Sequence, residues 1–169
     1  ELNDQIQSGL KDIGWGFATQ VLKDTIPLAL TGSDVIGQAR TGSGKTAAFG
    51  LPTMNSCKPT GELQALILTP TRELANQVAE EMNTLQGNYG LKILTVYGGT
   101  DLEKQARTLG KGVDIIVGTP GRVMDMTGRG HIDLASPSLF VLDEADRMLD
   151  MGFFTDIIWV IERMTSRSQ

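Results

Sequence analysis

The stretch "FVLDEADRM", residues 140–148, places three carboxylates within four positions: Asp143, Glu144 and Asp146. They directly follow an apolar run that begins at Leu139, and such a run is typical of a strand buried on both faces. Carboxylates this close resist ionising together unless a cation lies near them. The sequence therefore predicts a buried strand that ends at a site for positive charge.

Short apolar runs of strand length alternate with helical patterns along the rest of the chain. The expected strands are Val35–Ile36, Ala65–Leu68, Ile93–Val96, Ile115–Val117 and Leu139–Leu142. The expected helices are one capped by Asn3 and ending near Gly14, then Thr19 to about Leu30, Lys45–Asn55, Arg72–Leu85, Leu102–Leu109, Arg122–Met126 and Phe154–Met164. Apolar strands that alternate with helices predict an α/β fold, with an open, mainly parallel sheet and helices on both of its faces.

Length and composition indicate one domain over residues 1–169, because 40% of the residues are hydrophobic and the chain is short for two cores. No run of about 18 apolar residues predicts a membrane span, and no secretory leader is visible. Cys57 is the only cysteine and His131 the only histidine, so neither an internal disulfide nor a Cys/His metal cluster is expected. An unpaired cysteine favours a reducing, cytoplasmic location.

The net charge of −5 has the wrong sign for a domain that grips nucleic acid by bulk electrostatics. The 15 basic residues are also scattered along the chain, among 20 acidic ones. A bound polyanion would therefore have to be held by backbone N–H groups and by individual arginines.

The unusual motifs of the sequence all follow expected strands. In parallel sheets, ligands bind beyond the carboxyl ends of the strands, where loops and helix N-termini converge. In chain order these motifs are "ARTGSGKT" (39–46), "TPTRELA" (69–75), "GG" (98–99), "TPGR" (119–122) and "DEAD" (143–146). We expect them to form one site.

"ARTGSGKT" is the strongest local signal. Gly42 and Gly44 would let backbone N–H groups surround phosphate oxygens, Lys45 would reach the β and γ phosphates, and the Thr46 hydroxyl would bind Mg²⁺. Ala39 stands where the strict pattern has a glycine. The alternative is an ordinary Gly/Ser-rich turn with a solvated lysine, but the expected flanking strand and helix favour a nucleoside triphosphate.

The carboxylates after the last strand fit the same ligand. Asp143 is expected to hold Mg²⁺, partly through water, and the cation would offset the crowding of negative charge. Glu144 would point differently and could act as the general base on a water molecule, which is hydrolysis chemistry. The alternative is an exposed helix start, where acidic residues are also favoured.

The five motifs, in this order, resemble the first RecA-like domain of the DEAD-box ATP-dependent RNA helicases over nearly the whole chain. The resemblance implies that ATP, Mg²⁺ and RNA, as a single strand or short duplex held through its backbone, are bound, and that Asp146 couples the nucleotide site to a second domain. The nucleotide-contacting residues it implies are Thr19, Leu22, Ala39, Arg40, Thr41, Gly42, Ser43, Gly44, Lys45 and Thr46. The RNA-contacting residues it implies are Pro70, Thr71, Arg72, Gly98, Gly99, Thr119, Pro120, Gly121 and Arg122.

Two departures from the family qualify this resemblance. The sequence ends at "SRSQ", where family members continue into a Ser-Ala-Thr motif and a second RecA-like domain, so we expect a monomeric half of an enzyme with little turnover alone. The opening segment 1–30 contains "GWGFATQVLKDTIP" (14–27), which resembles the adenine-recognising Q motif but has Leu22 in place of its glutamine. Weak selectivity for adenine is therefore expected.

Three other functions compete with this interpretation. A P-loop kinase for a small molecule would need neither Glu144 nor the "TPGR" loop, and no arginine-rich lid is visible. A DNA-directed motor stays open, because loops aimed at a backbone distinguish RNA from DNA poorly. A non-catalytic nucleotide-binding module is the third. Stimulation of ATP hydrolysis by RNA against DNA would separate these functions.

Overall fold

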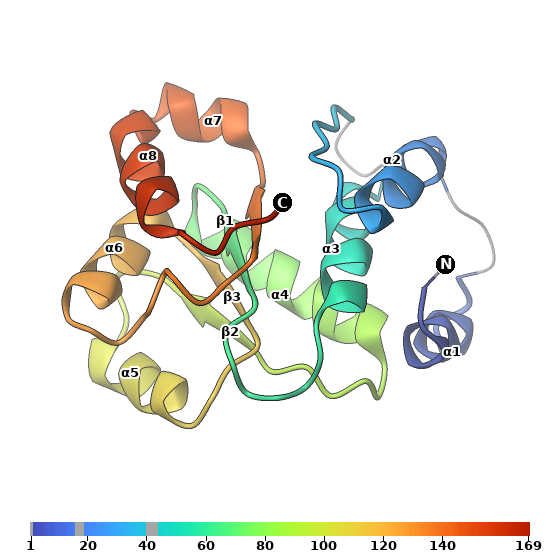
Figure 1. Ribbon diagram of the computed structural model, residues 1–169, viewed down its shortest axis with the longest axis horizontal. Helices are drawn as coiled ribbons and strands as arrows, with labels where there is room; N and C mark the ends of the chain where they lie inside the picture. Colours follow the sequence, from blue (N-terminus) through green and yellow to red (C-terminus); the bar gives the residue numbers. More distant parts are fainter. Residues whose placement is uncertain (1, 16–18, 40–43) are drawn as a thin grey trace.

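The computed structural model describes residues 2–15, 19–39 and 44–169, and its centre is a four-stranded parallel sheet (Figure 1). The strands are β1 (Ala65–Leu68), β2 (Ile93–Val96), β3 (Ile115–Gly118) and β4 (Leu139–Leu142). Their order across the sheet is β2-β3-β1-β4, and every neighbouring pair is parallel. The predicted α/β class is confirmed, with β3 one residue longer than expected.

Helices cover both faces of this sheet (Figure 1). In chain order they are α1 (Asp4–Asp12), α2 (Gln20–Leu30), α3 (Lys45–Ser56), α4 (Arg72–Gln86), α5 (Leu102–Gly110), α6 (Pro120–Gly128), α7 (Ala145–Asp150) and α8 (Phe154–Arg163). The first four pack on one side, and α5, α6 and α8 on the other. None of the helices in the described ranges combines the length and apolar character needed to cross a bilayer.

The two central strands, β1 and β3, carry no polar side chain because both of their faces are buried. In β1, Ala65 and Ile67 belong to the core beneath α3 and α4, whereas Leu66 and Leu68 belong to the core beneath α6 and α8. This is the period of two expected when successive side chains point to opposite faces. Each fully buried aliphatic side chain contributes about 1.5–3 kcal/mol, so the central strand anchors the two layers.

The predicted strand Val35–Ile36 is wrong. Both side chains are exposed, Ile36 completely, and the segment has no strand assignment. A strand requires a hydrogen-bonded neighbour for its backbone groups. The outer edge of β4 is instead met by Gln169, whose carbonyl accepts the Phe140 N–H at 3.1 Å, while its side-chain amide donates to the Ser33 carbonyl. Apolar sequence alone did not supply the pairing.

The helix boundaries follow local capping chemistry. Asn3 caps α1 as predicted, because its side chain accepts the Ile6 N–H at 3.0 Å. Helix α6 begins at Pro120, two residues before the predicted start at Arg122, since proline is favoured in the first turn of a helix. The difference matters because the "TPGR" motif thereby forms the N-terminus of α6.

Candidate functional site

The loops that carry the motifs leave the sheet side by side. The Thr69 N–H donates to the Gly118 carbonyl at 2.9 Å, and the Thr119 N–H donates to the Val96 carbonyl at 3.0 Å. The Asp143 N–H donates to the last carbonyl of β1 at 2.9 Å. The sheet ladder thus continues one residue beyond three strands, which fixes where each loop begins.

Gly118 lets two of these loops approach closely. A Cβ added at this position would lie 2.7 Å from Val123 Cγ2 and 2.8 Å from the Val96 carbonyl oxygen. The second of these atoms belongs to the backbone, so it has little freedom to move away. Sequence reasoning missed Gly118 as a site residue, although a glycine that ends a strand is itself a signal of close backbone approach.

Lys45 meets the carboxylates of the "DEAD" motif. It is the first residue of α3, and its Nζ lies 3.3 Å from Asp143 Oδ1 and 3.8 Å from Glu144 Oε1. The two motifs most distant in the chain therefore converge at the carboxyl end of the sheet. Their catalytic and metal-binding roles stay predictions.

Asp143 is an unusually placed carboxylate. Its side chain is only 5% exposed, and Oδ1 accepts no hydrogen bond from the described residues beyond its ion pair with Lys45. Burial raises the pKa of Asp143 above the ordinary value, Lys45 lowers this pKa in part, and the charge of Glu144 raises it again. A buried, under-partnered carboxylate is the ligand type that a hard cation such as Mg²⁺ prefers, so the residue fits a metal.

Glu144 has a strained backbone. With φ 53° and ψ 50° it is the only non-glycine residue of the described part with a positive φ. The left-handed conformation costs a residue with a side chain about 1–2 kcal/mol. It precedes α7 and is held by Arg147, whose Nη1 lies 3.5 Å from Glu144 Oε2. Strain of this kind gathers at functional sites, and here it turns Glu144 away from the extended path of β4.

The predicted phosphate-binding loop is described only at its two ends. Arg40, Thr41, Gly42 and Ser43 lie outside the described residues. Gly44 has φ +85° and precedes α3, whose first N–H groups have no side-chain cap. Ala39 and Thr46 are partly buried on either side of the loop. The start of α3 thus offers the donors that phosphate needs, next to Lys45.

The Q-motif-like segment packs against the end of that loop. A Cβ added to Gly44 would lie 3.5 Å from Thr19 Oγ1 and 3.8 Å from Leu22 Cδ1. Leu22 is 3% exposed and belongs to the apolar core around α3. Gln20 does not replace it, because its amide donates to Asp24 at 2.8 Å on the exposed side of α2. The segment therefore borders the loop with an apolar side chain.

The two predicted RNA-contacting arginines lie over neighbouring loops. The Arg72 guanidinium sits 5.3 Å from the centroid of the Tyr97 ring, and its Nη1 is 3.7 Å from where a Cβ of Gly99 would stand. Arg122 donates to the Thr100 carbonyl at 3.2 Å. Loops after β1, β2 and β3 are thereby joined through their side chains.

The other predicted RNA-contacting residues divide by burial. Pro70 and Pro120 are buried, so they shape their loops and do not present side chains to a ligand. Those at the surface, in part or fully, are Thr71, Gly98, Gly99, Thr119 and Gly121. Asp146 is exposed in the first turn of α7.

Gln105 was missed by sequence reasoning. It is 9% exposed on α5, and its Oε1 accepts a hydrogen bond from Arg122 Nη1 at 3.0 Å. The helical pattern of 102–109 predicts a helix but does not reveal that a polar residue on it is buried, because that depends on what packs against it. A buried polar residue between two motif loops is a sign of function that only the structure provides.

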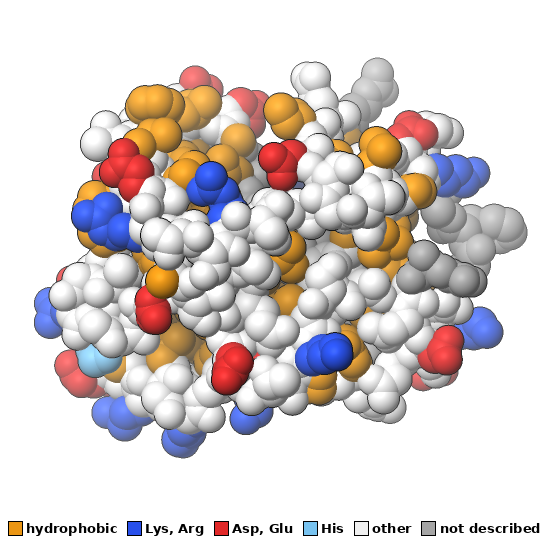
Figure 2. All heavy atoms as spheres, viewed as in Figure 1, with side chains coloured by type: hydrophobic (Ala, Val, Ile, Leu, Met, Phe, Trp, Pro, Cys, Tyr) orange, Lys and Arg blue, Asp and Glu red, His pale blue; other side chains and the backbone are white. Residues whose placement is uncertain are grey.

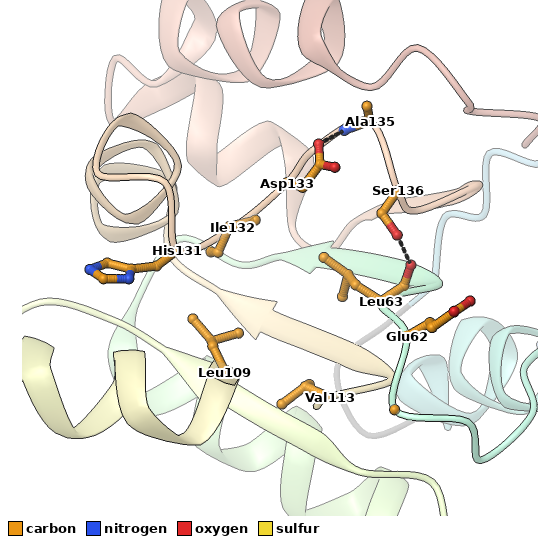
Figure 3. A pocket seen from close by; sticks show the side chains of 10 residues that line it. Glu62, Leu63, Leu109, Val113, His131, Ile132, Asp133, Ala135 and Ser136 are labelled. Atoms are coloured by element: carbon orange, nitrogen blue, oxygen red, sulfur yellow. Dashed lines mark hydrogen bonds between the residues drawn. The ribbon is translucent and has the colours of Figure 1, made fainter. Parts of the chain in front are cut away.

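A hollow of about 520 Å³ lies at the opposite end of the sheet (Figure 3). Glu62 and Leu63, which precede β1, line it together with Val113, which precedes β3, and His131. Glu62, Leu63 and Val113 lie at the amino ends of the strands, away from the motif loops. On the face in Figure 2, basic and acidic side chains are interspersed.

Together these features define a RecA-like α/β domain with a nucleotide-type site at the carboxyl ends of its strands. The chain belongs to the DEAD/DEAH box helicase family, which residues 19–169 match. It is 52% identical over 154 residues to the RNA helicase CrhR of Synechocystis sp., covering 91% of this chain and 31% of that protein. The ATP-dependent RNA helicase CshA of Listeria monocytogenes is 45% identical over 99% of this chain and 32% of its own.

Solved structures agree with the sequence relatives. A DEAD box protein from Methanococcus jannaschii superposes with a TM-score of 0.93 at 42% identity, over 99% of this chain and 47% of that one. A hypothetical ATP-dependent RNA helicase from Sulfolobus tokodaii gives a TM-score of 0.90 at 38% identity, over 99% and 49%. The chain spans about a third of the length of the curated relatives named above.

Proposed function

We propose that this chain is the nucleotide-binding half of an RNA-dependent ATPase, which works with a second RecA-like domain to unwind or remodel RNA. The observation that carries the proposal is the contact of Lys45 with Asp143 and Glu144 at the carboxyl end of the sheet. A phosphate-loop lysine beside two carboxylates, one to hold Mg²⁺ and one to position water, brings together parts that phosphoryl transfer to water uses.

Each residue of this group has a separate task. Lys45 would hold the β and γ phosphates, and Asp143 with Thr46 would hold Mg²⁺, partly through water. When bound, the metal neutralises charge that develops on the phosphate oxygens. Glu144, which is 28% exposed, would orient a water molecule and accept its proton. The buried carboxylate of Asp143 supports the metal site, since Oδ1 has only the Lys45 ammonium as a partner among the described residues and could also face a cation.

Two arginines support binding of RNA through its backbone. Among the described residues, no carboxylate forms an ion pair with Arg72 or Arg122. Their charges are therefore available to phosphate, which a guanidinium can contact with two parallel hydrogen bonds. Contacts of this type need no net positive charge on the domain, and they carry no base sequence.

The proposal includes a second domain because phosphoryl transfer needs further positive charge near the phosphates, which the described residues do not supply. Asp146 is exposed two residues after Glu144. At this position it could contact the second domain and couple it to the nucleotide site. The chain alone is expected to bind nucleotide with little turnover. Its monomeric state and cytoplasmic location stay predictions.

The test is ATP hydrolysis by the full-length protein with matched single strands of RNA and DNA. RNA should stimulate hydrolysis, DNA of the same sequence should not, and Glu144→Gln should remove the activity while keeping nucleotide binding. Equal stimulation by DNA would favour a DNA-directed motor. Nucleotide binding without hydrolysis under either condition would favour a non-catalytic module.

A further inference from the structure

Gln105 connects two of the motif loops, because its side-chain amide both donates and accepts hydrogen bonds. Its Nε2 donates to Thr100 Oγ1 at 2.8 Å and to the Tyr97 carbonyl at 3.3 Å, while its Oε1 accepts from Arg122 Nη1 at 3.0 Å. The Arg122 guanidinium makes a second bond, from Nη2 to the Thr100 carbonyl. One buried amide thus holds the loop after β2 and the arginine after β3 in a single arrangement.

The arrangement reaches Arg72 as well. Tyr97, whose carbonyl Gln105 binds, lies under the Arg72 guanidinium, and Thr100 Oγ1 also donates to the Tyr97 carbonyl at 3.1 Å. Moving Gln105 would therefore loosen the support of both arginines. The effect on Arg122 should be larger, because that contact is direct.

The partners of Arg122 are neutral, and this is unusual for a fixed arginine. A carboxylate at position 105 would hold the guanidinium more strongly, but it would also cancel the charge that attracts phosphate. Asp101, the acidic residue next to Thr100 in the chain, is engaged elsewhere, since its carboxylate accepts the N–H groups of Glu103 and Lys104. The site thus fixes an arginine without neutralising it.

We propose that Gln105 is a positioning residue, which orients Arg122 and the Thr100 loop for RNA phosphate while leaving the arginine charge free. The inference rests on the proposed function, because it takes the surface above these loops to be the RNA path. It adds a residue outside the five motifs, and it requires an uncharged side chain at position 105.

Two variants of the full-length protein test the two parts of this statement. Gln105→Met keeps the length of the side chain but removes its hydrogen bonds, and Gln105→Glu keeps an acceptor for Arg122 but adds a negative charge. In RNA-stimulated ATP hydrolysis, each should raise the half-saturating RNA concentration about threefold to tenfold, the size of the net contribution of one ordinary hydrogen bond. The rate at saturating RNA and the affinity for Mg-ATP should not change.

Salt dependence separates the two variants. Gln105→Glu should also flatten the dependence of RNA affinity on salt by about 0.7 in the logarithmic slope, because one phosphate contact is neutralised. Gln105→Met should keep the parent slope, since the charge of Arg122 remains. The double variant Gln105→Met with Arg122→Ala should lose less RNA affinity than the sum of the two single losses, because most of the Gln105 effect acts through Arg122.

Gln86→Met is the matched control for loss of a buried amide. Gln86 is 5% exposed at the end of α4 and bonds both backbone groups of Leu91, far from the motif loops. It should lower the melting temperature without changing the half-saturating RNA concentration. If the Gln105 variants behave as Gln86→Met does, their role is structural only and the inference is wrong. If Arg122→Ala also leaves RNA affinity unchanged, the proposed RNA surface itself fails.

Discussion

Two regions of the domain differ in how well their polar groups are partnered. One is the nucleotide end, formed by Lys45, Asp143 and Glu144. The other is the arginine network, formed by Thr100, Gln105 and Arg122. At the nucleotide end, Oδ1 of buried Asp143 has no partner among the described residues except its ion pair with Lys45, and Glu144 has a strained backbone. In the arginine network, the guanidinium of Arg122 has only neutral partners among the described residues, and the amide of Gln105 both donates and accepts hydrogen bonds. On the proposed function, the polar groups of the first region would be completed by the charges of Mg-ATP. The polar groups of the second region are already hydrogen-bonded before RNA binds.

This difference indicates which region lowers the stability of the ligand-free domain. Groups that conflict in the ligand-free protein raise its free energy and are relieved when the ligand binds. Groups that are satisfied in advance reduce the ordering that binding requires. Removal of the Asp143 carboxylate should therefore stabilise the ligand-free domain, and removal of the Gln105 amide should destabilise it, although both weaken ligand binding.

The largest effect is expected at the nucleotide end. Lys45→Ala should weaken Mg-ATP binding by about 100-fold or more, because contacts from a charged donor to phosphate are lost. Calorimetric titration of the chain measures this, with Lys104→Ala, an exposed lysine on α5, as the matched control. Binding of Mg-ATP by Lys45→Ala at parent affinity would remove the lysine from the site.

The preference for ATP over GTP tests the role of Leu22 at the nucleotide end. The chain should distinguish ATP from GTP poorly, since Leu22 offers adenine no hydrogen bond. Leu22→Gln should favour ATP over GTP by about 1–3 kcal/mol if its amide pairs with adenine. Titrations of both nucleotides with parent and Leu22→Gln measure the difference. Gln20→Ala serves as the control, and a strong parent preference that this substitution abolishes would overturn the assignment of Leu22.

The arginine network should respond to charge and shape separately. Arg122→Ala should lower the logarithmic salt slope of RNA binding by about 0.7, the value for one lost phosphate contact on a single strand. Arg122→Lys should keep the slope but lose affinity, because an ammonium lacks the guanidinium fork. Fluorescence anisotropy with a labelled single-stranded RNA at several salt concentrations measures both. An Arg122→Lys variant that binds as tightly as the parent would mean that charge alone matters.

The contrast between the regions also explains what the sequence could predict. Four strands and the loops that follow them were predictable, because apolar runs and short sequence motifs are local signals. Val35–Ile36 failed because strand formation depends on a neighbour, and the outer edge of β4 is met by Gln169. The convergence of Lys45 with Asp143 was expected from the motifs, whereas the left-handed backbone of Glu144 was not.

Gln105 was beyond prediction for a different reason. Its burial and its bonds to Thr100 and Arg122 depend on how α5 packs beside β2 and β3, and no local pattern encodes that geometry. The same holds for Gly118, whose missing side chain matters only because the Val96 carbonyl lies beside it. Local signals located the site, and tertiary contacts determine how its parts are held.

The central claim is that the buried negative charge of Asp143, next to Glu144, destabilises the ligand-free domain. The most direct test is Asp143→Asn, with stability and nucleotide binding measured on the same variant. Burial raises the pKa of Asp143, so the ionised form costs stability above the folded-state pKa, and this cost disappears as the pH falls through it. At neutral pH the ligand-free variant should therefore be more stable than the parent by about 1 kcal/mol, and its stability should vary less in this acidic range.

In the same protein, Mg²⁺ should no longer strengthen ATP binding, whereas it should do so clearly in the parent. Thermal unfolding of the ligand-free chain at neutral and acidic pH, together with ATP titrations with and without Mg²⁺, gives both results. A variant that is less stable than the parent at neutral pH and still binds ATP with the parent's dependence on Mg²⁺ would contradict the account.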